Sequence, residues 1–148
     1  MIAVKIDTQN FASPDKLSRF ISADGQADFL RAVCLSMLPV VHDRIHVNGK
    51  AADGSPIGTY SDLYLKYTRP KNNRGTDPKV ILSLTRQMEN DFSVVADGSR
   101  YGLGFKNEVN AQKSEWAEQT YKKKIYSLTN EEKEQAVNAA NEYVNGVL

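Results

Sequence analysis

Cysteine is almost absent from this sequence of 148 residues. The single cysteine, Cys34, excludes an intramolecular disulfide framework and a zinc site built from several thiolates. A charge excess is also missing, because 19 lysines and arginines stand against 18 acidic residues, for a net charge of +1. Such a chain is neither a polycation that coats nucleic acid nor an acidic tail. Its length and its 41% hydrophobic share are typical of one globular domain, which we expect to span residues 1–148.

Long hydrophobic runs are missing as well. The most apolar stretch, residues 32–41, is interrupted by Ser36 and Pro39 and is far shorter than the roughly 20 residues that cross a bilayer. Residues 1–7 alternate apolar with polar or charged side chains and lack the apolar region of a signal peptide. We therefore expect a protein that is made in the cytoplasm and has no membrane partner.

Hydrophobic periodicity in the first third of the chain predicts a strand and two helices. Apolar residues alternate over 2–6, as in a half-buried strand, and Ser13-Pro14 is typical of the start of a short helix. Apolar side chains then recur every four positions, which predicts a long helix over 24–47. Pro39 should kink or break this helix, and Asn48-Gly49 should end it.

The second half of the chain predicts a hairpin between helices. Apolar residues at helical spacing predict a helix over 80–92. Residues 92–96 and 100–105 flank Asp97-Gly98, which is a strong hairpin signal. Thr129 and Glu132 form a capping box before a last helix with one apolar stripe. The predicted class is α+β, with a small antiparallel sheet packed against a long N-terminal helix and a C-terminal helix.

Candidate chemistry is sparse. His42 and His46 lie four residues apart and could share one helix face, but two nitrogens do not complete a zinc site. We interpret both as structural or surface residues, and Cys34 as a small side chain in an apolar stripe. The glycines near Gly54 lack the lysine of a phosphate-binding loop. We therefore expect no catalytic residue, no metal and no cofactor.

A long segment rich in glycine and proline, residues 49–79, is the most unusual part of the sequence, and we call it the arm. We expect the arm to protrude as an extended loop without regular elements, because long loops in compact domains are usually functional or disordered. It combines basic and aromatic side chains. The candidate partner-binding residues are Tyr60, Tyr64, Lys66, Tyr67, Arg69, Lys71, Arg74 and Lys79.

Three interpretations of the arm remain open on these residues alone. Basic residues over 66–79 with interleaved tyrosines could hold a nucleic-acid backbone without sequence preference. The same charges could simply keep a solvated loop soluble. Alternatively, the arm could become ordered against an acidic partner surface. Lys122-Lys123-Lys124 is a second, weaker basic cluster, partly offset by Glu115 and Glu118.

Several short motifs, taken in order, resemble the phage virion-morphogenesis or tail-completion family. The resemblance covers about residues 25–148. In this family a long helix ends in a glycine- and proline-containing turn, and a lysine-bearing loop, a hairpin and a C-terminal helix follow. The matching motifs are Arg44-Ile45 leading into Gly49, Asp53–Gly58, Tyr60-Ser61 with Lys66, Ile81–Met88 and Lys124–Thr129. One departure is Arg86, which stands where the family usually has glycine.

The resemblance implies a structural virion protein of a tailed bacteriophage, with no catalytic residues to carry over. Such subunits form a homo-oligomeric ring, six-fold or twelve-fold, at the neck or tail-completion site. Their neighbours are other neck, portal-adaptor or tail-tube proteins, and genomic DNA passes through the channel. The implied location is the virion, with the host cytoplasm as the site of assembly. We expect Arg69 and Arg74 to reach an acidic patch on a neighbouring subunit. The alternative is a nonspecific nucleic-acid-binding module.

Overall fold

The computed structural model describes all residues except 1–14, 16–17, 20–21 and 148. The strand expected over 2–6 and the helix start at Ser13-Pro14 lie outside the described residues. The main elements follow the order α2 (Ala23–His42), α3 (Gln87–Asp91), β1 (Phe92–Asp97), β2 (Arg100–Phe105), α4 (Glu108–Tyr121) and α5 (Asn130–Val147). The fold is α+β, as predicted, and it contains the long N-terminal and C-terminal helices.

Helix α2 begins at a good cap and ends at a glycine. The Ser22 hydroxyl accepts a hydrogen bond from the Gly25 amide at 3.0 Å, which satisfies one of the free amide groups of the first turn. Pro39 does not end the helix, which continues to His42 and then widens into a π-helical turn over Asp43–Val47. Gly49 stops it with φ of +62°, at a point where a β-carbon would lie 2.4 Å from the Val80 carbonyl oxygen. The predicted stop at Asn48-Gly49 is thus confirmed.

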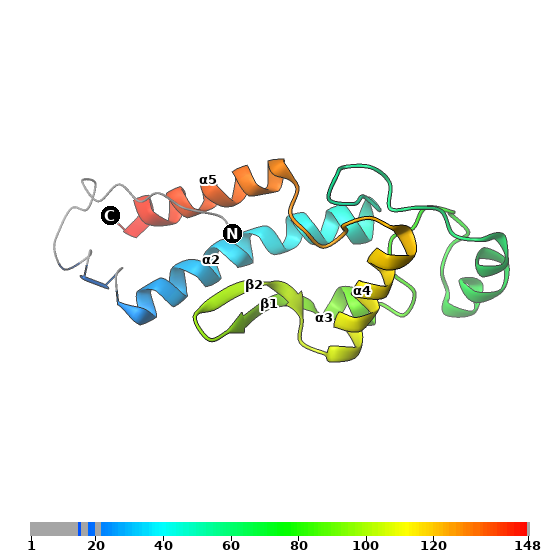
Figure 1. Cartoon of the computed structure of the whole chain (residues 1–148), viewed down its shortest axis with the longest axis horizontal. Coiled ribbons are helices and arrows are strands. Elements are labelled where there is room, and N and C mark those ends of the chain that lie inside the picture. Colours follow the sequence, from blue (N-terminus) through cyan, green and yellow to red (C-terminus); the bar gives the residue numbers. More distant parts are fainter. Residues whose placement is uncertain (1–14, 16–17, 20–21, 148) are drawn as a thin grey trace.

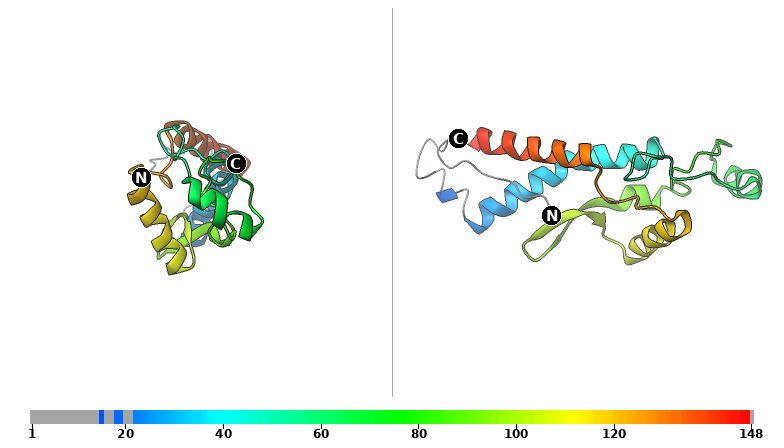
Figure 2. Two further views of the ribbon diagram at one scale, coloured as in Figure 1. Left: turned by 90° about the vertical axis from the view of Figure 1, so that its right-hand side faces the viewer. Right: turned by 45° about the horizontal axis from the view of Figure 1, so that its top comes forward.

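Helix α2 lies between the hairpin and α5 (Figure 1). Strands β1 and β2 pair antiparallel from Phe92 opposite Phe105 to Asp97 opposite Arg100, which confirms the predicted hairpin. Helix α5 runs alongside α2 in both further views (Figure 2). Its apolar stripe packs Ala140 and Val144 against Phe29 of α2, so α5 is fixed chiefly to α2.

The main core lies where the C-terminal end of α2 meets the chain that returns from the arm. The buried side chains gathered there come from five separate segments: Val41, Ile45, Ala51, Ile57, Val80, Phe92 and Ile125. Removing apolar surface of this kind from water is the main favourable contribution to folding. This core holds the base of the arm firmly against the body.

Two parts of the body differ from the sequence predictions. The helix expected over 80–92 is confined to Gln87–Asp91, because Leu82 and Arg86 have φ values of 49° and 63°, which a right-handed helix does not allow. Conversely, residues 107–120 carried no helix prediction, yet α4 occupies most of them. The Asn107 side chain caps α4 by accepting a hydrogen bond from the Val109 amide at 2.8 Å.

The arm projects beyond the end of α2 and away from the hairpin (Figure 1). Its two legs pair at an isolated antiparallel bridge between Thr59 and Lys79. The expectation of an arm without regular elements is wrong, because a π-helical turn over Tyr64–Thr68 and a 3-10 turn over Pro70–Asn72 form its end. The arm is therefore a folded projection.

Candidate partner-binding arm

Arg69 organises the interior of the arm. Its side chain is only 4% exposed. Its Nε donates a hydrogen bond to the Gly75 carbonyl oxygen at 3.0 Å, and its Nη1 donates to the Ser83 carbonyl oxygen at 3.3 Å. The guanidinium carbon lies 4.7 Å from the centre of the Tyr60 ring, a cation–π distance. Arg69 thus links the helical turns of the arm to the chain that returns to the body.

Arg74 makes a second internal link. Its Nε donates to the Leu84 carbonyl oxygen at 2.9 Å, and its Nη2 donates to the Ser83 hydroxyl at 2.6 Å. The sequence suggested that Arg69 and Arg74 reach a neighbouring subunit, but the structure places both in contacts within their own chain. Among the described residues, no carboxylate pairs with either guanidinium, so their positive charges are not neutralised locally.

Two of the arm tyrosines also face inward. The Tyr60 and Tyr64 rings lie 4.9 Å apart, and the Tyr60 hydroxyl accepts a hydrogen bond from the Ile81 amide at 3.2 Å. Burial raises the pKa of Tyr64 above its ordinary value. Both rings line a cleft of about 650 Å³ between the arm and the body, together with Leu82 before α3, Met88 of α3 and Tyr121 of α4.

The outer surface of the arm has a different composition. Leu63 is 71% exposed and Tyr67 is 53% exposed, and the Lys66 ammonium lies 5.3 Å from the centre of the Tyr67 ring. Pro70 and Lys71 are exposed on the next turn. We call Leu63, Lys66, Tyr67, Pro70 and Lys71 the arm tip. Lys79 is also exposed, at the base of the arm. The arm tip combines apolar contact area with positive charge, a combination suited to a partner surface.

The base of the arm is anchored by a buried ion pair that sequence reasoning missed. The Arg44 Nε donates to Glu132 Oε1 at 2.6 Å, with both side chains buried. The remaining guanidinium nitrogens donate to the carbonyl oxygens of Lys50, Ile125 and Ser127. Glu132 also belongs to the capping box of α5, because its Oε2 accepts from the Thr129 amide at 2.9 Å. The capping box was the available signal for Glu132, but nothing in the sequence identifies its arginine partner.

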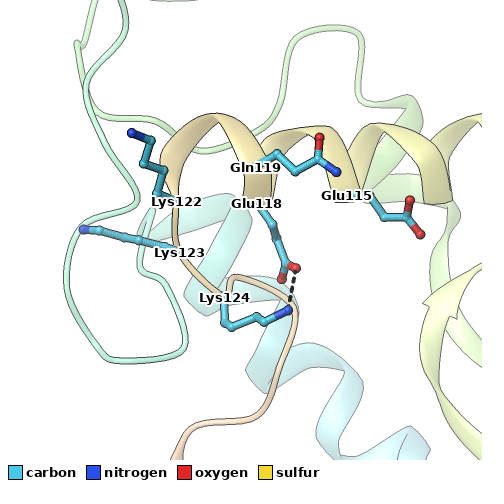
Figure 3. Close-up of a pocket in the computed structure, with 6 residues that line it drawn as sticks. All are labelled: Glu115, Glu118, Gln119, Lys122, Lys123 and Lys124. Atoms are coloured by element: carbon cyan, nitrogen blue, oxygen red, sulfur yellow. Dashed lines mark ion pairs between the residues drawn. The ribbon is translucent and has the colours of Figure 1, made fainter.

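The second basic cluster also makes structural contacts (Figure 3). Lys122, Lys123 and Lys124 line a pocket of about 390 Å³ at the end of α4. The Lys123 ammonium donates to the Pro56 carbonyl oxygen at 2.6 Å and to the Ser55 hydroxyl at 3.0 Å. In the close-up, Lys124 and Glu118 point toward each other, with 3.7 Å between their charged atoms. The hydrogen bonds of Lys123 therefore connect the end of α4 to the turn at the start of the arm.

The two histidines occupy different surroundings. His46 is buried and its Nδ1 donates to the Ile81 carbonyl oxygen at 3.1 Å. Its burial lowers its pKa to about 4. The Nδ1 of half-buried His42 lies 3.2 Å from a carboxylate oxygen of Asp43. Cys34 is half-buried, which raises the pKa of its thiol. In the described part of the chain, no group of three or more His, Cys, Asp or Glu side chains is arranged to hold a metal ion.

Comparison with known proteins adds no relative. No family model, no curated protein sequence and no solved structure matches this chain. None of the helices that the structure describes has the length and apolar character needed to cross a membrane.

Proposed function

We propose that this chain is a structural subunit of a tailed-phage virion, assembling into a ring at the neck or tail-completion site. One observation carries the proposal. Three motifs of the resemblance are far apart in sequence, but they meet at the base of the arm. Arg44 from the first motif donates to the carbonyl oxygens of Ile125 and Ser127 in the last motif, and Ile57 of the glycine- and proline-containing turn packs in the same core as Ile45 and Ile125. These three motifs thus form one structural unit.

Arg86 departs from the family pattern in residue type but fits it in backbone conformation. The family usually has glycine at this position, and Arg86 has φ of 63° and ψ of 5°. Glycine adopts positive φ without the steric cost that a β-carbon imposes. The backbone conformation at residue 86 is therefore the one that glycine would favour, although the side chain differs.

The arm supplies the kind of surface that a ring subunit needs. A ring forms when one surface of a subunit binds a different surface of the next, and the rotation between them closes. The arm is held rigidly by Arg69 and Arg74, and it presents exposed Leu63 and Tyr67. A braced projection of this type can contact a neighbouring subunit without losing much conformational entropy on binding.

The nucleic-acid alternative has less support. Arg69 and Arg74 are used inside the arm, which leaves Lys66, Lys71 and Lys79 as the exposed cations of residues 66–79. Three phosphate contacts correspond to a salt dependence with a slope of only about −3 on a logarithmic plot. Tyr60 and Tyr64 pack against each other. Tyr67, whose ring centre lies 5.3 Å from the Lys66 ammonium, is therefore the one arm tyrosine left to stack on a base.

Two measurements on the purified chain test this proposal. Sedimentation velocity over a wide concentration range, followed by negative-stain microscopy, should show closed rings whose mass is a multiple of the 16.5 kDa protomer. Fluorescence anisotropy with duplex DNA at low salt should show weak binding. A chain that stays monomeric at every concentration would overturn the proposal, and tight DNA binding with strong salt dependence would then favour the alternative.

A further inference from the structure

The chain has a second exposed apolar surface, on helix α4. Val109 is 59% exposed and Trp116, the only tryptophan of the chain, is 56% exposed. They lie seven residues apart on one helix, so both side chains project from nearly the same side. Glu108 and Glu115 flank them and are exposed. We call Val109, Trp116, Glu108 and Glu115 the α4 face.

The α4 face does not contribute to folding in the way that the apolar stripe of α5 does. Val144 of α5 is buried against α2, whereas Val109 and Trp116 remain mostly in contact with water. Tryptophan is enriched among the residues that contribute most to binding between proteins. An exposed tryptophan and an exposed valine on one side of a helix are thus typical of an interaction surface.

The arm tip and the α4 face are complementary in chemistry. Each has two exposed apolar side chains. The arm tip adds exposed Lys66 and Lys71 next to the single acid Asp62, so this surface is net positive. The α4 face adds exposed Glu108 and Glu115 next to half-buried Lys113, so this surface is net negative. The wider charge distribution agrees: the arm has six basic residues and three acidic ones, whereas the rest of the chain has thirteen and fifteen. Opposite charges around an apolar centre favour association and fix its orientation.

The two surfaces lie on separate parts of the molecule. The arm forms one end of the structure, and α4 lies beside the hairpin on the flank of the body (Figures 1 and 2). Arg69 and Arg74 fix the arm to residues 75, 83 and 84, so the arm is not free to swing along its own body. One copy can therefore offer its arm tip to one neighbour and its α4 face to another.

We propose that the arm tip of one copy binds the α4 face of a second copy, with Leu63 and Tyr67 on Val109 and Trp116, and with lysines opposite the flanking glutamates. This inference rests on the proposed ring and names the contact that closes it. Such a contact joins two different surfaces, so it repeats from head to tail and forms a closed ring when the rotation permits.

A charge exchange tests the contact. Lys66→Glu with Lys71→Glu should weaken self-association at least tenfold, and Glu108→Lys with Glu115→Lys should do the same. An equimolar mixture of these two variants should form rings in which the two variants alternate, because the reversed arm matches the reversed α4 face and the unchanged arm matches the unchanged α4 face. A chain that carries all four changes should again form rings. Lys133→Glu with Glu134→Lys, on the exposed surface of α5, is the matched control and should leave assembly unchanged.

Crosslinking gives a direct readout. In a Cys34→Ser background, one chain carries Leu63→Cys and a second carries Val109→Cys. Under mild oxidation, a disulfide-linked dimer should form in the mixture at a much higher yield than in either chain alone. A wild-type chain that forms no oligomer overturns both the ring and this contact. Wild-type rings that tolerate both charge reversals and give no mixed crosslink overturn this contact alone, leaving the ring intact.

Discussion

Two buried arginines, one in the body and one in the arm, show how differently these regions use charge. Arg44 binds three carbonyl groups and the buried carboxylate of Glu132. Arg69 binds two carbonyl groups and the face of Tyr60, and no carboxylate among the described residues pairs with it. In the body the positive charge is neutralised on site. In the arm, the charge of Arg69 is stabilised by carbonyl groups and an aromatic ring and is not neutralised by a carboxylate. The arm therefore keeps a positive charge that a partner can recognise.

The largest expected effect comes from breaking the ion pair of the body. Arg44→Met leaves Glu132 buried without its cation, and removing one member of such a pair typically costs about 3–5 kcal/mol. Urea denaturation should show this loss in the free energy of unfolding. Adding Glu132→Gln removes the orphaned charge and should recover part of the loss. If the free energy of unfolding of Arg44→Met lies within about 1 kcal/mol of the wild-type value, water screens the Arg44–Glu132 pair.

A change of pH should also act on the body and leave the arm intact. The pKa of buried His46 is about 4, against an ordinary value of 6.5. The unfolded chain therefore takes up this proton first as the pH falls. Stability is unaffected by His46 above about pH 6.5 and decreases by about 1.4 kcal/mol per pH unit between 6.5 and 4, a total of about 3 kcal/mol.

Thermal or chemical unfolding at several pH values measures this dependence. His46→Gln should flatten the profile between pH 6.5 and 4. The arm contains no histidine, so hydrogen exchange in its helical turns should not accelerate over the upper part of this range. If stability falls with pH at the same slope in the wild type and in His46→Gln, His46 is not the group responsible for the loss.

The arm arginine should have a smaller and more local effect. Arg69→Met removes the hydrogen bonds to Gly75 and Ser83 and should favour opening of the arm by about 1–3 kcal/mol. Hydrogen exchange should accelerate over residues 61–75, while the free energy of global unfolding changes little. Lys71→Met, on the exposed surface of the same segment, is the control. A global loss as large as that of Arg44→Met would remove the distinction between the two regions.

The sequence predicts those elements whose signals are local. The Asp97-Gly98 turn indicates the hairpin, the Thr129–Glu132 capping box indicates the start of α5, and apolar periodicity indicates α2. Helix α4 escapes prediction because its largest apolar residue, Trp116, faces solvent and forms no stripe.

The internal roles of the arm residues have no sequence signal. Arg69 and Arg74 bind mainly backbone carbonyl groups, which every residue carries, so residue types cannot identify the acceptors. An arginine in a glycine- and proline-rich segment therefore has the same appearance in sequence whether it braces the segment or faces a partner. Only the folded chain distinguishes Arg69, which is buried, from Lys66 and Lys71, which are exposed.

The smallest expected effect concerns residue 86, on the chain that returns from the arm to the body. Its positive φ costs a residue with a β-carbon roughly 1–2 kcal/mol. Glycine avoids this cost, but its greater conformational freedom in the unfolded state reduces the stability gained by the substitution. Arg86→Gly should therefore be about 0.5–1 kcal/mol more stable than Arg86→Ala. Both variants lose the contact of exposed Arg86 with Glu89 at 3.7 Å, so their difference isolates the backbone. Urea denaturation of the two variants side by side provides the measurement. If Arg86→Ala proves as stable as Arg86→Gly, the left-handed conformation is not what this position requires, and the match to the family's usual glycine loses its physical basis.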